Sequence, residues 1–166
     1  MRNYLAERAG VNTAREFFLL WMLGQDLPGA ITVEPADGEA LPPSEYNKIE
    51  SDTKYEAPMR FSLAGVQLKF SAVQHVNAGL TIPATGQGGS WIVKLPSSRF
   101  QAVPENEYSM MTLARMLGMD VPEIQLLPID QIANIPEGIG KFGGNAFVIK
   151  RFDRVDGQAI HIEDFA

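Results

Sequence analysis

The sequence contains no cysteine, which excludes disulfide bridges, cysteine nucleophiles and thiolate zinc sites. It has only two histidines, His75 and His161, which lie far apart along the chain without a companion pair, so we expect no metal site within this segment. No apolar run approaches the ~18 residues of a membrane span, and the N-terminus has no signal-peptide pattern. We therefore expect a cytoplasmic protein without membrane contact.

Positive charge is also scarce. The 14 lysines and arginines are outnumbered by 20 aspartates and glutamates, for a net charge of −6. This balance argues against a broad nucleic-acid-binding face but leaves room for a local basic pocket that binds a small anion. With 166 residues, of which 45% are apolar and 20% charged, the composition is that of a globular chain.

The chain divides into two parts by composition. Residues 3–24 are predicted to form an apolar helix, and Gly29–Glu34 a short strand. The stretch Pro35–Pro58 is acidic and rich in proline, which is typical of a connector. We therefore predict a helix-strand subdomain with its linker over residues 1–58 and a second unit over residues 59–166.

The second unit reads mainly as strands. A strand, a tight turn at Ala64–Gln67 and a second strand come first, and Asn77-Ala78-Gly79 is a hairpin signal. The predicted strands are Met59–Leu63, Leu68–Val76, Leu80–Pro83, Ser90–Leu95, Ile124–Leu127 and Ala146–Ile149, and a later turn is predicted at Asp156-Gly157.

One helix is well marked between these strands. Pro104 suits its first turn and Gly118 is placed to end it. An apolar series with helical spacing is predicted to face the core: Met110, Leu113, Ala114 and Leu117. Together these elements predict an α+β fold, a curved antiparallel sheet with a helix packed behind it.

Three features of this unit together suggest a nucleotide clamp. Lys94 lies inside an apolar strand, where its charge is costly unless it meets an anion. The Ala64–Gln67 turn offers backbone N–H groups that can hold a phosphate. Glu107 lies near the edge of the predicted buried stripe and needs a cationic partner. A glycine turn, a strand lysine and a helix glutamate follow one another in this order in the small lobe of protein kinases.

Five motifs in register carry a more specific resemblance. The sequence resembles the HipA family of toxin–antitoxin serine/threonine kinases over residues 60–166, with a weaker similarity before Pro35. The motifs are Phe61–Lys69, Trp91–Pro96, Glu105–Tyr108, Leu117–Pro122 and Val148–Arg154.

The resemblance implies an ATP-binding lobe and roles for particular residues. Lys94 would bind the ATP phosphates and Glu107 would orient it. Backbone groups of Lys150 to Phe152 would hold adenine, and Asp153 would contact the ribose or the hinge. The loop over the phosphates would consist of Ala64, Gly65, Val66, Gln67 and Lys69. Ser62 falls on the serine whose autophosphorylation silences such kinases, because a phosphoserine beside the ATP phosphates would repel them.

The resemblance also implies a function for the complete protein. Such kinases phosphorylate a cytoplasmic protein, such as an aminoacyl-tRNA synthetase, and arrest growth, and a HipB-like DNA-binding antitoxin restrains them. The family's catalytic aspartate, its asparagine and its Mg²⁺-binding aspartate belong to a helical lobe expected beyond residue 166, so this segment is expected to be inactive alone. It would be a piece of a longer protein, a truncated gene product or one part of a split toxin. The alternative is a non-catalytic module that binds a nucleotide or only a protein partner.

Overall fold

The structure is a computed structural model, and it describes residues 17, 20, 24–38, 69–75, 79–83, 88–97, 99–135 and 143–163. The predicted strand Met59–Leu63 and turn Ala64–Gln67 lie outside the described residues, as does most of the predicted helix over residues 3–24. Within that range the structure describes Phe17 and Leu20, both helical, and Gly24, which begins a 3₁₀ turn.

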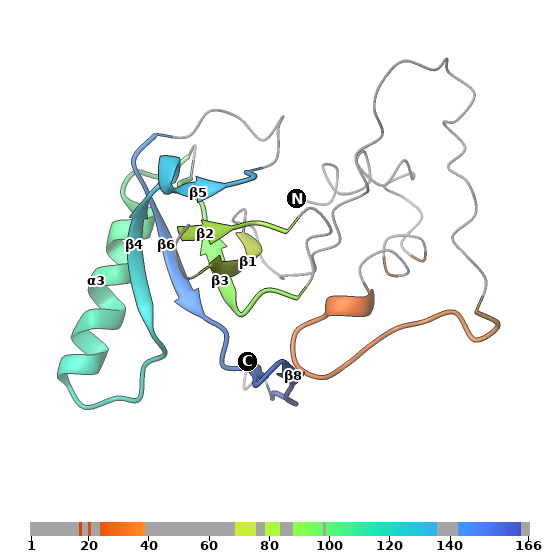
Figure 1. The fold of residues 1–166 in the computed structure, drawn as a ribbon. Coiled ribbons are helices and arrows are strands. Elements are labelled where there is room, and N and C mark those ends of the chain that lie inside the picture. The colour runs from red at the N-terminus through yellow and green to blue at the C-terminus, as the bar shows by residue number, and fades with distance from the viewer. Residues whose placement is uncertain are drawn as a thin grey trace, which may run out of the picture.

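Six strands form one curved sheet in the order β4-β6-β3-β1-β2-β5. They are β1 (Lys69–His75), β2 (Gly79–Thr81), β3 (Trp91–Lys94), β4 (Ile124–Pro128), β5 (Ile132–Ala133) and β6 (Asn145–Lys150). Only the short 3₁₀ turn η2 (Ile129–Gln131) separates β4 from β5, although these strands stand at opposite ends of the order. The sheet must therefore curl into a half-barrel to bring its two ends together (Figure 1).

The predicted α+β class and the curved sheet are confirmed. Five predicted strands appear within one or two residues of the expected bounds, and β1 and β2 form the predicted hairpin with His75 opposite Gly79. The sheet departs from a purely antiparallel one at a single pair, because β2 and β5 run parallel. A separate hairpin, β7 (Arg154–Val155) with β8 (Gln158–Ala159), is closed at the predicted Asp156-Gly157 turn.

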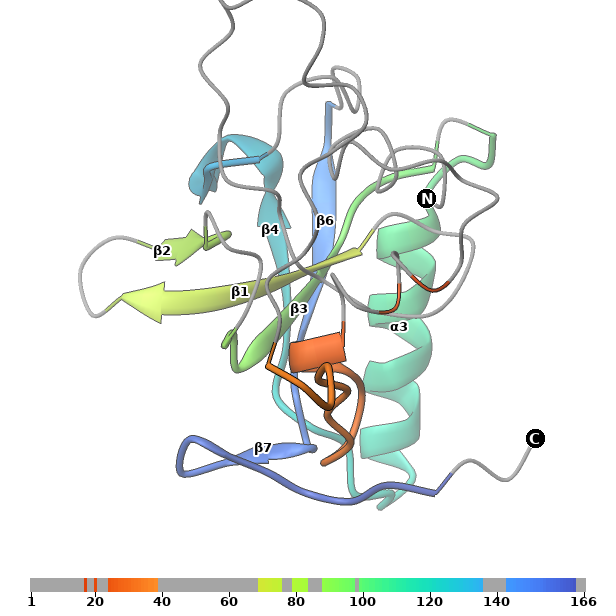
Figure 2. The ribbon, with the colours of Figure 1, turned by 90° about the vertical axis from the view of Figure 1, so that its right-hand side faces the viewer.

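The predicted strand over Gly29–Glu34 is wrong. The segment 24–38 consists of a 3₁₀ turn, η1 (Gly24–Asp26), followed by turns and extended chain without a strand partner. Ile31 is 60% exposed, so the apolar residues of this stretch do not face a sheet. Figures 1 and 2 place the segment, in orange, beside the β7–β8 hairpin instead.

The hydrophobic core fills the inside of the half-barrel. Alternate residues of β3 face it, Trp91 and Val93, while Ile92 and Lys94 are on the opposite face and only half buried. The core residues are Phe70, Ala72, Leu80, Ile82, Trp91, Val93, Leu95, Ile132, Ala146 and Val148. This alternation places Lys94 outside the core.

Helix α3 (Val103–Met116) covers the outer face of the sheet along β4 and β6 (Figure 2). Pro104 lies in its first turn and Gly118 follows its end with a φ of 83°, both as predicted.

The prediction that one apolar stripe of this helix faces the core is wrong. Met110, Leu113 and Leu117 are 56%, 48% and 70% exposed. The face on the sheet instead includes Pro104, which is buried, and Glu107, which pairs with Lys94 of β3. The helix has apolar residues on both faces, and periodicity alone does not distinguish them.

Candidate functional site

Lys94 and Glu107 form an ion pair between β3 and α3. The Lys94 Nζ donates to Oε2 of Glu107, and both side chains are about a quarter exposed, at 25% and 26%. The ammonium also lies 5.4 Å from the centroid of the Phe147 ring on β6, within the range of a cation–π contact. Asn145 Nδ2 donates to Glu105 Oε1 at 3.1 Å and ties the start of the helix to the same strand. The lysine is thus held by a carboxylate and an aromatic ring while part of it stays open to solvent.

A second lysine lies directly opposite the first. In the register of β1 and β3, Lys69 pairs with Lys94, so the two side chains lie on one face of the sheet. Burial lowers the pKa of Lys69, the positive charge of Lys94 lowers it further, and the carboxylate of Glu107 partly offsets both. Like charges directly opposite each other destabilise a sheet, and one carboxylate balances only one of the two cations. The arrangement has the charge to bind an anion such as a phosphate chain.

The predicted phosphate-covering loop cannot be placed beside these lysines. Ala64, Gly65, Val66 and Gln67, together with Ser62, lie outside the described residues, and their roles stay predictions. The description resumes at Lys69, the first residue of β1.

The predicted hinge follows the end of β6. The N–H of Lys150 donates to the carbonyl of Glu123 and that of Arg151 to the carbonyl of Ser90, both at 2.8 Å. Phe152 is 67% exposed, and its N–H makes no hydrogen bond within the described part of the chain. Of these three backbone donors, the one at Phe152 is thus without a partner among the described residues.

Asp153, predicted to contact the ribose or the hinge, lies in the interior and is 6% exposed. Its oxygens accept from Arg151 Nε at 2.9 Å, Arg151 Nη2 at 2.8 Å, Arg154 Nη1 at 3.0 Å and the Gly29 N–H at 2.9 Å. Burial would raise the pKa of Asp153, but these hydrogen bonds and positive charges outweigh it and lower the pKa to about 2.

Asp26 completes this group from the other part of the chain. It accepts from Arg154 Nη2 at 2.7 Å and from Arg151 Nη1 at 3.5 Å. Burial would lower the pKa of Arg151, but Asp153 and Asp26 outweigh it and raise the pKa. We call the four residues Asp26, Arg151, Asp153 and Arg154 the hinge cluster. Sequence reasoning missed it: the charged residues within 150–154 are visible in the sequence, but nothing marks Asp26 as their partner.

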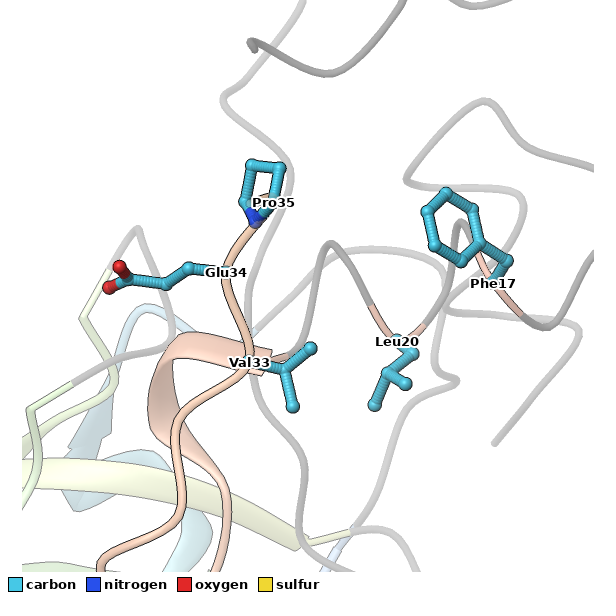
Figure 3. Close-up of a pocket in the computed structure, with 5 residues that line it drawn as sticks. All are labelled: Phe17, Leu20, Val33, Glu34 and Pro35. Carbon is cyan, nitrogen blue, oxygen red and sulfur yellow. The ribbon is translucent and has the colours of Figure 1, made fainter. Parts of the chain in front are cut away.

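A small apolar cavity of about 40 Å³ lies apart from both groups. Its lining residues are Phe17, Leu20, Val33, Glu34 and Pro35, and the Glu34 carboxylate points away from the apolar side chains (Figure 3). Among the described residues that line it, none directs a polar group into the cavity.

The described residues hold neither a metal-binding cluster nor a membrane-spanning helix. They contain no group of three or more histidine, cysteine, aspartate or glutamate side chains that could hold a metal ion. None of their helices combines the length and the apolar character needed to cross a membrane.

Comparisons with known proteins agree on one family. The sequence model described as "HipA-like C-terminal domain" matches residues 61–166. In Sinorhizobium fredii, a protein named "Putative kinase Y4dM" is 58% identical over 100% of this chain, and "Putative kinase Y4mE" is 32% identical over 96%. The chain spans 41% of the length of each of these two relatives. The "Serine/threonine-protein kinase toxin HipA" of Shewanella oneidensis is 28% identical over 92% of this chain and 35% of its own length.

Proposed function

Because the chain belongs to the family of HipA-like C-terminal domains, we propose that it is the ATP-binding lobe of a serine/threonine protein kinase. The observation that supports this most is the ion pair of Lys94 and Glu107 with Lys69 opposite the lysine. Phosphoryl transfer needs the triphosphate charge neutralised and fixed in position, which a lysine oriented by a carboxylate does in protein kinases. The excess of one positive charge at this site suits that task.

Each part of the site has a task in ATP binding. Lys94 and Lys69 bind the phosphate oxygens, Glu107 holds the Lys94 ammonium in place, and residues 64–67 cover the phosphates with backbone N–H groups. The Phe152 N–H donates to the adenine ring at the hinge. ATP would supply the transferable phosphoryl group, and Mg²⁺ would neutralise its charge. The metal ligands and the catalytic base are expected from residues outside this segment.

The longer protein would be a growth-arresting toxin of the cytoplasm. One relative carries the printed name of a serine/threonine-protein kinase toxin, which supports this proposal by likeness. Its substrate would be a cytoplasmic protein, for which an aminoacyl-tRNA synthetase is the family's example. A HipB-like DNA-binding antitoxin would restrain it, and autophosphorylation of Ser62 would silence it by placing a dianion beside the phosphates.

The direct test is a calorimetric titration of the full 166-residue chain with ATP. We expect Lys94→Ala to weaken binding by about tenfold or more, because a charge-assisted contact to phosphate is lost. Arg99→Ala is the matched control, since Arg99 is an exposed cation that lies beside Phe100 and not in the site. A folded wild-type chain that does not bind ATP, or equal affinity in the wild type and Lys94→Ala, would overturn the proposed function.

A further inference from the structure

The hinge cluster joins two segments that are distant in the sequence. Five hydrogen bonds connect residues 26–29 with residues 151–154, and Asp26 also accepts from the Gly88 N–H ahead of β3. Arg154 contributes three of the five, to Asp26 Oδ1, to the Leu27 carbonyl at 3.0 Å and to the Gly29 carbonyl at 2.9 Å. Residues 24–29 are therefore fastened to the chain that leaves β6.

The cluster is nearly dry and its formal charges cancel. The side chains of Arg151, Asp26, Asp153 and Arg154 are 1%, 8%, 9% and 13% exposed, with two positive and two negative charges. A buried group of ions is seldom needed for stability, because apolar side chains of similar volume serve as well. It does impose geometry: two bonds from Arg151 to Asp153 fix the guanidinium and the carboxylate in one relative orientation.

The residue fixed by this geometry is Phe152. Its neighbours Arg151 and Asp153 are both held in the cluster, and the Arg151 N–H donates to the carbonyl of Ser90, the residue before β3. The Phe152 ring lies outside the core and is largely exposed. This is expected if the cluster positions the Phe152 backbone and not its ring. Its N–H is the hinge donor that has no partner in the described part of the chain.

We infer that Asp26 and Arg154 are positioning residues for nucleotide-base recognition. Through the hinge cluster they hold the Phe152 backbone where its N–H meets the base. Residues 24–29 therefore belong functionally to the nucleotide site, although they lie far from it in the sequence. The inference rests on the proposed function, and it separates two parts of the ligand. Lys69 and Lys94 bind the phosphates at one end, and the hinge cluster controls only the base at the other.

The test compares ATP with inorganic tripolyphosphate, which shares the phosphate chain and lacks the base. Both are titrated by calorimetry into the full chain and into Asp26→Asn. We expect ATP affinity to fall about fivefold or more, the effect of a misplaced hydrogen bond, while tripolyphosphate affinity stays within about twofold. Asp130→Asn is the matched control, because Asp130 is exposed on η2, and it should change neither affinity.

A second variant covers the case in which Asp26→Asn does not fold. Arg154→Lys keeps the positive charge but cannot donate to Asp26, Leu27 and Gly29 at once, so it should show the same selective loss of ATP affinity. Partial recovery in Asp26→Glu would support the role of the carboxylate. Equal loss of both ligands in the folded variants, or loss of neither, would overturn the inference.

The two proposals fail in different ways. If the wild-type chain binds neither ATP nor tripolyphosphate, the proposed function is wrong and the inference falls with it. If the wild type binds both and Lys94→Ala weakens both, but folded Asp26→Asn and Arg154→Lys retain the preference for ATP, only the inference is wrong.

Discussion

At the scale of single residues, the two carboxylates that the sequence singled out differ in what surrounds them. Glu107 has one lysine partner and keeps a quarter of its side chain exposed. Asp153 accepts from two arginines and a backbone N–H, with almost no exposure. The Glu107 carboxylate can rearrange when a ligand binds its lysine partner. The Asp153 carboxylate instead fixes the backbone around it. The same residue type thus has two tasks, set by its environment.

The pKa of Lys69 should respond in opposite directions to its two charged neighbours. Lys94→Met removes a positive charge that lowers this pKa, so the pKa should rise toward its ordinary value. Glu107→Gln removes a negative charge that raises it, so the pKa should fall further. An NMR titration of the lysine side-chain signals measures both. Shifts of equal sign in the two variants would contradict the placement of Lys69 beside the ion pair.

The hinge cluster should make the free energy of unfolding depend on pH in the acidic range. The pKa of Asp153 falls from 3.8 to about 2 on folding, so its contribution is fully present above about pH 4 and is lost as the pH drops toward 2. Asp153→Asn should remove up to about 2 kcal/mol of pH-dependent stability in this window. Denaturant unfolding at pH 5, 3.5 and 2.5 measures it. Asp120→Asn, at an exposed site, should keep the wild-type slope, and a parallel slope in Asp153→Asn would refute the role of the cluster.

At the scale of elements, β3 and α3 form the Lys94–Glu107 ion pair through the faces that they present. β3 turns Trp91 and Val93 to the core and Lys94 to the helix. α3 places Glu107 on its sheet-facing side because Pro104 starts that side one turn earlier. The ion pair follows from the strand period of two and the helix period of 3.6, with α3 packed along β4 and β6 on the face of the sheet to which Lys94 points.

The exposed apolar side of α3 leads to a prediction with two leucines. Leu113→Ala should change the free energy of unfolding by no more than about 0.5 kcal/mol, because Leu113 is 48% exposed on a helix and alanine favours helices. Leu95→Ala should cost about 2–5 kcal/mol, because Leu95 is fully buried in the core.

Chemical denaturation of the full chain measures both leucine variants under the same conditions. A large loss for Leu113→Ala would restore the original prediction that this stripe faces the core.

At the scale of the whole molecule, the features that the sequence predicted are those with a local signal. The strand alternation around Val93, the Asp156-Gly157 turn and the ends of α3 at Pro104 and Gly118 each depend on a few adjacent residues. The pairing of Lys94 with Glu107 could also be predicted, because a charged residue inside an apolar strand is unusual.

What the sequence did not predict depends on contacts over long separations. Asp26 meets Arg154 across 128 positions, and no nearby residue marks the pairing. The strand expected over Gly29–Glu34 failed for the same reason, since a strand needs a neighbouring strand and Gly29 bonds instead to Asp153 and Arg154, which follow β6. The division between residues 58 and 59 stays a prediction.

The last prediction concerns how ligand binding stabilises the entire chain. A ligand that binds only the folded state stabilises it by about 2.7 kcal/mol at a hundred times its Kd, which for a chain of this size raises Tm by about 5–10 °C. Thermal unfolding with ATP should show this rise in the wild type and much less at the same ATP concentration in Lys94→Ala, whose Kd is higher. Added salt should reduce the rise, because lysine–phosphate attraction is screened. A rise of equal size in both proteins would mean that ATP binds elsewhere on the chain, and the two lysines on the outer face of the sheet would then lose their proposed role.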